Sequence, residues 1–103
     1  MNRRPTHPGA ILREDVLPEL GMTVAKLADT LQITRQHLHG ILHEKRSITP
    51  NVALRLGKFI GNGPDIWLRM QGAYDLYNEK SKIARQLSEI PHYEDGRHNQ
   101  AAS

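Results

Sequence analysis

The residues between positions 34 and 46 are the best candidates for chemistry in this chain. Arg35 and Gln36 open a segment that also holds three histidines, and Lys45 and Arg46 follow it. An arginine can bind guanine through two hydrogen bonds, and a glutamine can bind adenine in the same way. Two histidines four residues apart on a helix can instead hold a metal ion. The segment is therefore a DNA-reading helix, a metal site, or simply a solvated face.

The metal alternative lacks ligands. His39 and His43 are spaced to share one helical face, but His37 points elsewhere on the helix, and the nearest carboxylate, Glu44, begins a loop. The chain contains no cysteine. Two ligands are too few for a stable metal site, so we expect no metal and no cofactor. The histidines are better interpreted as hydrogen-bonding groups near DNA, whose protonation below pH ~6.5 would strengthen DNA binding.

Two short helices position these residues. Thr23 and Thr34 are both suitable N-cap residues, and apolar residues three and four apart follow each of them. In the second helix Leu38, Ile41 and Leu42 face inward. A corner of about three residues separates the two helices, which is typical of a helix-turn-helix. An ordinary helical hairpin with a polar face is the alternative.

A helix-turn-helix places the N-terminal part of its second helix in the DNA major groove. Thr34 then lies where its hydroxyl and backbone N–H can meet a phosphate. The loop after the helix carries two cations suited to the DNA backbone. The predicted DNA-binding residues are Thr34, Arg35, Gln36, His39, His43, Lys45 and Arg46.

Proline and glycine mark the remaining helices. Pro8, Pro50 and Pro64 are each expected at the first position of a helix, where proline is favoured. Pro18 should end the first helix, and Gly61 fits the end of the fourth. No stretch alternates with a period of two, so we predict an all-α fold. Its five helices cover about 8–17, 23–31, 34–42, 50–60 and 64–88.

The last of these helices is too long for the core it serves. About 25 residues make a helix of ~37 Å. Its first half offers Ile66, Trp67 and Tyr77 for packing, whereas Ile83, Leu87 and Ile90 later form a narrow stripe among charged residues. This second half is a frayed, solvated tail or a protein-binding or dimer helix, and we favour the latter. The predicted organisation is a flexible N-terminus 1–7, a DNA-binding domain 8–78, a helical extension 79–90 and a disordered tail 91–103.

Composition limits the class of protein. At 103 residues the chain has room for one domain, and its net charge of +3 suits a polyanionic partner. No apolar run approaches the ~18 residues of a membrane-spanning helix, and no signal peptide is evident, so we expect a cytoplasmic protein. Glu14 and Asp15 are adjacent, point about 100° apart on a helix and cannot act as a carboxylate pair. No grouped nucleophile and base is found, so we expect no enzyme.

The chain from His7 to about Leu76 resembles the HigA-type antitoxins, a branch of the Xre/Cro-like helix-turn-helix family. The matching stretches are "HPGAILREDVLPELGMT", "LADTLQITRQHL", "KRSITPNVALRL" and "GPDIWLRMQGAYDL". The resemblance implies a homodimer that binds an inverted-repeat operator in double-stranded DNA and represses its own operon. It also implies that the protein neutralises a co-encoded toxin, typically a messenger-RNA endonuclease. An orphan regulator without a toxin and a pure protein-interaction module are the alternatives.

Four positions depart from the family pattern. Gln32 stands where such turns usually carry glycine, which should cost roughly 1 kcal/mol and reshape the turn slightly. His43 and Glu44 replace the common Asn-Gly pair after the recognition helix, which calls the usual helix-ending cap into question. Val24 stands where the broader family often has a phosphate-binding glutamine, so affinity should depend more on Lys45 and Arg46.

Overall fold

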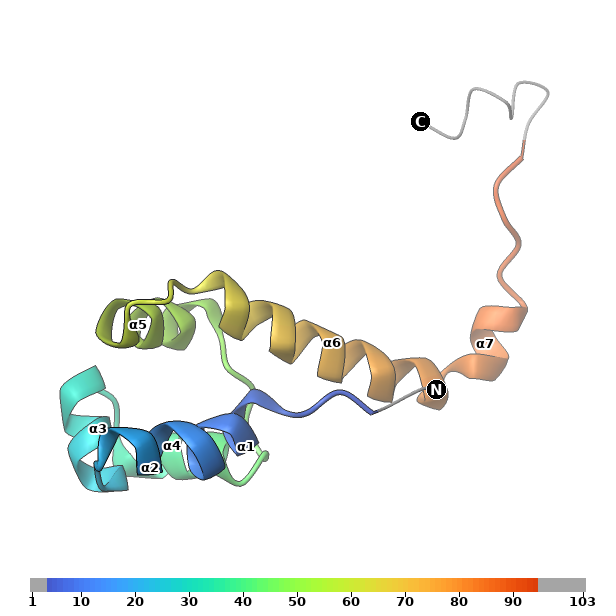
Figure 1. The fold of residues 1–103 in the computed structure, drawn as a ribbon. Coiled ribbons are helices and arrows are strands. Elements are labelled where there is room, and N and C mark those ends of the chain that lie inside the picture. Colours follow the sequence, from blue (N-terminus) through green and yellow to red (C-terminus); the bar gives the residue numbers. More distant parts are fainter. Residues whose placement is uncertain (1–3, 95–103) are drawn as a thin grey trace.

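The computed structural model describes residues 4–94, and all regular structure within that range is helical (Figure 1). This confirms the predicted all-α fold. The predicted disordered tail lies outside the described residues from position 95 onward, and residues 91–94 are exposed. Among residues 4–94 the structure contains no candidate membrane-spanning helix. The elements are α1 (Pro8–Ile11), η1 (Leu12–Val16), α2 (Leu17–Leu20), α3 (Val24–Leu31), α4 (Arg35–Leu42), α5 (Pro50–Ile60), α6 (Asp65–Lys82) and α7 (Ala84–Ser88).

Three threonines set where the central helices begin. Thr23, Thr34 and Thr49 have extended backbones, and each hydroxyl accepts a hydrogen bond from the N–H three residues later, at 3.1, 3.0 and 3.3 Å. Each bond satisfies one of the N–H groups that a helix leaves without an internal partner. The predicted caps at Thr23 and Thr34 are therefore confirmed.

One apolar core joins η1, α2, α3, α4 and α5 to the start of α6. The N-terminal helix, α3, α4 and α5 supply most of it, and α6 contributes Trp67, which is 2% exposed. Burial of this surface is the main force that holds the short helices together, since helices of this length are marginal alone. The fully or almost fully buried apolar residues are Leu12, Leu17, Leu27, Ala28, Leu31, Leu38, Ile41, Leu42, Ile48, Val52, Ala53, Leu56 and Trp67.

The first helix continues through Pro18, contrary to the prediction that Pro18 ends it. α1, η1 and α2 follow one another without a gap, and the backbone stays right-handed helical at Leu12 and Leu17. η1 is a π-helical turn in which the Leu17 N–H bonds to the Leu12 carbonyl. This wider turn accommodates a proline that would otherwise clash with the carbonyl four residues earlier. The helix ends at Gly21, which has a φ of 62°.

The last helix is broken rather than continuous to residue 88. α6 ends at Lys82, Ile83 leaves helical geometry with a φ of −113°, and α7 follows. Figure 1 shows α6 running past the other helices, so its second half has little packed against it. The break turns Leu87 toward a groove that Leu76 also lines. The start also differs, because Pro64 is the N-cap residue of α6 and not its first helical residue.

Packing along α6 agrees with the prediction only in part. Trp67 is buried as expected, whereas Ile66 and Tyr77 are 41% and 40% exposed. Gln71 is buried instead, at 4% exposure. Its Oε1 accepts a 2.8 Å hydrogen bond from the Ile48 N–H, and its amide nitrogen donates to Asp75 at 3.0 Å. Gln71 therefore fastens the loop after α4 to α6.

Candidate nucleic-acid interface

The corner between α3 and α4 keeps its left-handed geometry despite the side chain of Gln32. This residue has a φ of 61° and a ψ of 42°. The Ile33 N–H donates to the Ala28 carbonyl at 3.0 Å, and the Gln32 N–H donates to Asp29 at 3.1 Å. These two bonds close a Schellman motif, in which glycine is usual at the left-handed position. The turn is therefore not reshaped to suit glutamine, and the helix-turn-helix corner is complete.

The exposed face of α4, its two cap residues and the loop after it contain every residue that the sequence predicts to contact DNA. Leu38, Ile41 and Leu42 are buried against the core, as predicted. That orientation leaves the opposite face of the helix in solvent. The predicted DNA-binding residues are all exposed: Thr34, Arg35, Gln36, His39, His43, Lys45 and Arg46.

The end of α4 turns the backbone of the two following cations back to the helix. Glu44 takes a left-handed conformation with a φ of 63°, so the usual cap persists without glycine. The N–H groups of Lys45 and Arg46 both donate to the Gly40 carbonyl, at 2.8 and 3.0 Å. The Arg46 stem lies so close to Gly40 that a Cβ there would stand 2.7 Å from Arg46 Cδ. Gly40 therefore provides the space in which Arg46 crosses the recognition helix.

The histidines of α4 have different surroundings. The rings of His39 and His43 stack with centroids 5.5 Å apart, and His43 Nδ1 lies 2.9 Å from the His39 carbonyl. His37 is half-buried, and its Nε2 has no hydrogen-bond partner among the described residues. Within residues 4–94 no group of three or more His, Asp or Glu side chains is arranged to hold a metal ion.

His7 is a structural residue at the start of α1. It is 3% exposed, and its Nδ1 accepts a 2.8 Å hydrogen bond from the Gly9 N–H at the start of α1. Its ring meets the edge of Tyr74 at 4.8 Å. Burial lowers the pKa of His7, and the opposing influences of Glu44, Asp75 and a backbone hydrogen bond to Arg46 are smaller. His7 thus connects α1, α6 and the loop after α4.

Sequence reasoning also missed two arginines that contact the ends of helices. Arg13 donates from Nη1 to the Leu42 carbonyl, at 2.6 Å, and its Nη2 pairs with Glu14 at 2.8 Å. The hydrogen bond to Glu14 is the main influence that raises the pKa of Arg13; desolvation opposes it, and the hydrogen bond to Glu44 raises the pKa further. Arg55 donates to the Leu31 carbonyl at 2.9 Å. Charge alone gives no signal for either role, since both residues look like ordinary surface cations.

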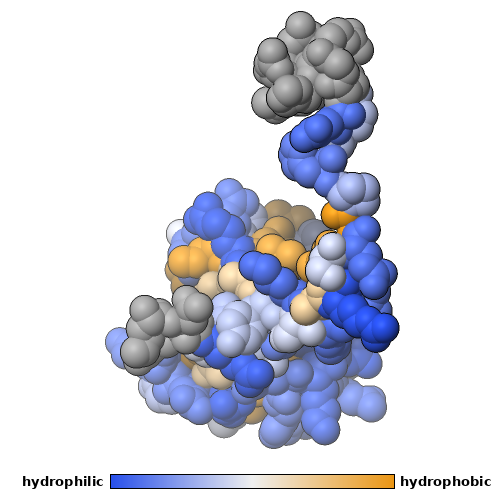
Figure 2. All heavy atoms as spheres, turned by 90° about the vertical axis from the view of Figure 1, so that its right-hand side faces the viewer, coloured by the Kyte–Doolittle hydropathy of each residue, from blue (hydrophilic) through white to orange (hydrophobic). Residues whose placement is uncertain are grey.

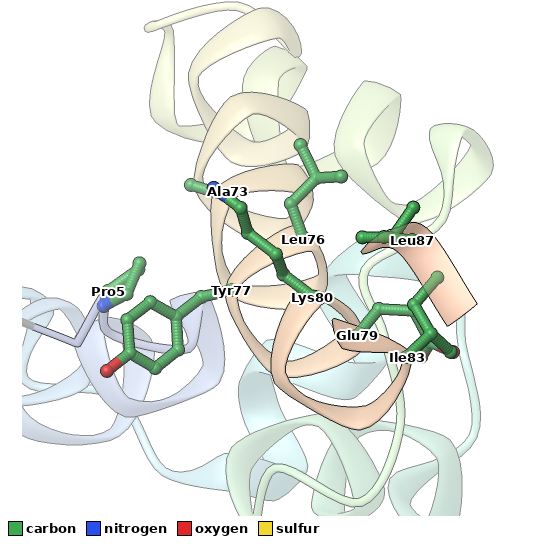
Figure 3. Close-up of a pocket in the computed structure, with 8 residues that line it drawn as sticks. All are labelled: Pro5, Ala73, Leu76, Tyr77, Glu79, Lys80, Ile83 and Leu87. Atoms are coloured by element: carbon green, nitrogen blue, oxygen red, sulfur yellow. The ribbon is translucent and has the colours of Figure 1, made fainter. Parts of the chain in front are cut away.

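A separate apolar groove lies where α6 meets α7. It encloses about 600 Å³. Figure 3 shows Pro5 beside Tyr77 on one side of it and Leu76, Ile83 and Leu87 on the other. Figure 2 shows apolar side chains gathered on this end of the molecule among hydrophilic ones. None of the predicted DNA-binding residues lines the groove.

Comparison with known proteins places this geometry in a family. A structure of an addiction module antidote protein of the HigA family from Coxiella burnetii is 39% identical and superposes with a TM-score of 0.81. That match covers 88% of this chain and all of the other. The chain belongs to the HigA family of helix-turn-helix antitoxins. The resemblance in the sequence predicted membership of this family, and the comparison confirms it.

Other relatives of this HigA family member extend the comparison. The Pseudomonas aeruginosa antitoxin HigA, solved with the higBA promoter, is 32% identical with a TM-score of 0.81 over 85% of this chain and 97% of the other. Virulence-associated protein I of Dichelobacter nodosus is 43% identical over 70 residues, or 68% of this chain. The match spans 65% of that relative's length, just under two thirds. No protein-family model matches the chain.

Proposed function

We propose that this HigA family member is a DNA-binding antitoxin that reads an operator with α4. The observation that carries the proposal is the exposed polar face of α4, which stands on a fully buried apolar face of the same helix. A buried face fixes the direction of the exposed side chains, so they meet DNA already oriented. The promoter DNA in the structure of the Pseudomonas aeruginosa relative supports this assignment.

Each exposed residue has a role that suits its chemistry. Arg35 and Gln36, in the first turn of α4, contact base edges in the major groove. Thr34 uses its hydroxyl for its own N-cap bond and can still donate its O–H to a phosphate. Lys45 and Arg46 contact the sugar-phosphate backbone. His39 and His43 lie further along the same face as additional hydrogen-bonding groups.

A salt-titrated anisotropy assay tests this function. The unmodified protein is titrated into a labelled duplex from directly upstream of its gene and into a scrambled duplex of equal length. We expect tighter binding to the upstream duplex, by ~10³-fold or more at physiological salt. Equally weak binding to both duplexes would contradict operator recognition by this protein.

The antitoxin role requires a toxin encoded by the neighbouring gene. We propose that the chain represses its own operon and neutralises a co-encoded toxin that cleaves messenger RNA. The support is its membership of the HigA family, in which the Coxiella burnetii neighbour is described as an addiction module antidote. Induction of the adjacent open reading frame should arrest growth, and co-expression of this chain should restore it. Growth arrest that this chain does not relieve would contradict neutralisation, and the absence of a toxic neighbour would leave an orphan regulator.

We also propose that two copies associate through the groove between α6 and α7. Leu76 and Ile90 are 71% and 65% exposed, and Leu87 is 42% exposed, on a part of the chain outside the predicted DNA surface. A two-fold contact here buries apolar surface and leaves both α4 helices free. The operator would then be an inverted repeat whose half-sites are ~34 Å apart or a multiple of that distance.

A further inference from the structure

Both helices of the helix-turn-helix end in the same unusual way. Each is followed by a residue other than glycine in the left-handed conformation, Gln32 after α3 and Glu44 after α4. Only these two non-glycine residues have a positive φ among residues 4–94. Such residues persist when surrounding contacts hold them in place.

An arginine from another helix reaches each of these ends. Arg55 of α5 donates to the carbonyls of Leu31 and Gln32, at 2.9 and 3.4 Å, while Asn51 holds its Nε at 2.7 Å. Arg13 of η1 donates to the carbonyl of Leu42. The last carbonyls of a helix lack internal partners and carry the negative end of the helix dipole. A guanidinium supplies both the missing donors and the opposite charge.

The contact of Arg13 extends to the left-handed residue itself. Arg13 Nη1 lies 3.4 Å from Glu44 Oε2, so one guanidinium contacts both the last turn of α4 and the residue that ends it. The next two residues, Lys45 and Arg46, are the cations assigned to the DNA backbone. Their N–H groups depend on the turn at Glu44, because both bond to the Gly40 carbonyl.

We propose that Arg13 and Arg55 are positioning residues for DNA binding, which hold the C-terminal ends of α4 and α3 respectively and do not contact DNA themselves. The inference rests on the proposed function. Arg55 fixes the corner that precedes Thr34, and Arg13 fixes the turn that aims Lys45 and Arg46. Two of the cations that a charge count would assign to phosphate are thus internal supports.

The test is a pair of rescue experiments by anisotropy on the upstream duplex. Arg13→Gln should weaken binding ~10-fold, a loss of about 1.4 kcal/mol. The slope of log K against log salt should stay unchanged, since no phosphate contact is lost. In a Glu44→Gly background, where glycine adopts the turn freely, the same substitution should cost only ~2–3-fold. Arg55→Gln should weaken binding by a similar factor, and it should cost less in a Gln32→Gly background.

A matched control removes one charge without removing a helix-end contact. Arg69 is exposed on α6 and has no ion pair or side-chain hydrogen bond among the described residues, so Arg69→Gln reports the general electrostatic effect. A salt slope reduced by about one in Arg13→Gln would show a direct phosphate contact and overturn the proposal. A loss no larger than that of Arg69→Gln would also overturn it.

Amide hydrogen exchange separates this proposal from the proposed function. Exchange at Lys45 and Arg46 should accelerate at least ~10-fold in Arg13→Gln and return toward the original rate with Glu44→Gly. Unchanged exchange would overturn the role of Arg13 whatever the protein binds. Accelerated exchange in a protein that does not select the upstream duplex would support the structural role and refute operator recognition. Circular dichroism melts confirm that each variant is folded at the assay temperature.

Discussion

At the scale of single residues, Gln32 shows a conflict between side chain and backbone. A residue with a Cβ is destabilised by about 1 kcal/mol in the left-handed conformation that Gln32 adopts. The Gln32→Gly variant should therefore raise the free energy of unfolding by about 1 kcal/mol. Its contacts in the turn are made by backbone atoms and are retained.

The matched control for this substitution is Gln36→Gly. Gln36 is exposed and lies within α4, where the backbone is right-handed. Glycine there should lower the free energy of unfolding by about 0.5–1 kcal/mol, because it loses more conformational freedom in a helix. Urea denaturation measures the free energy of unfolding of both variants. Changes of the same sign would show that Gln32 is not under backbone strain.

His7 makes the stability of the fold depend on pH. Because burial lowers its pKa in the folded protein, the native state favours the neutral ring, whereas the unfolded chain takes up a proton near the ordinary value of 6.5. The stabilising contribution is present above that pH and is lost as the pH falls from it through the lower, folded pKa. The melting temperature should therefore drop between pH 7.5 and pH 5.5.

The variant His7→Asn isolates this effect. Asparagine is a good N-cap residue and can accept the Gly9 N–H without titrating. Its melting temperature should fall less over the same pH interval than that of the unmodified protein. Equal falls in both proteins would assign the pH dependence to other groups.

At the scale of elements, the first helix touches the recognition helix through a glycine. A Cβ at Gly9 would overlap the carbonyl oxygen of Ile41, whereas a Cβ at Gly72 of α6 would meet nothing within 4 Å. Gly9→Ala should therefore destabilise the fold by roughly 3 kcal/mol, by separating α1 from α4. Gly72→Ala should stabilise it by about 0.5–1 kcal/mol. Thermal or urea unfolding of the two variants checks this, and a mild effect at Gly9 would refute the close approach.

Some elements of the fold were predictable from the sequence and others were not. The N-caps at Thr23 and Thr34 and the outward face of α4 were predictable, because they depend on residues a few positions apart. The passage of the first helix through Pro18 was not, since it depends on a π turn. Gln71 was also missed, because its partner Ile48 lies 23 residues away.

At the scale of the whole molecule, we propose that two copies meet at the groove between α6 and α7. The apolar stripe was predictable from its spacing, but the break at Ile83 that forms one side of the groove was not. Leu76→Glu should convert a dimer to a monomer, measured by light scattering after gel filtration, because a carboxylate would be buried in an apolar contact. Leu76 is 71% exposed, so the fold of each copy should be unaffected.

Leu54 on α5 offers a control for the dimer experiment. It is 60% exposed and lies outside the groove, so Leu54→Glu should leave the molar mass unchanged. Dissociation by Leu54→Glu and not by Leu76→Glu would move the dimer contact away from the groove.

We propose above all that α4 reads bases while the loop after it contacts the DNA backbone. The decisive measurement compares Arg35→Ala with Arg46→Ala on upstream and scrambled duplexes across a range of salt. Arg35→Ala should cost about 1–3 kcal/mol on the upstream duplex and relax discrimination at one base position. Arg46→Ala should weaken both duplexes alike and reduce the salt slope by about one. If both variants lower binding to the two duplexes equally, with the same salt slope, the assignment of bases to α4 and phosphates to the loop is wrong.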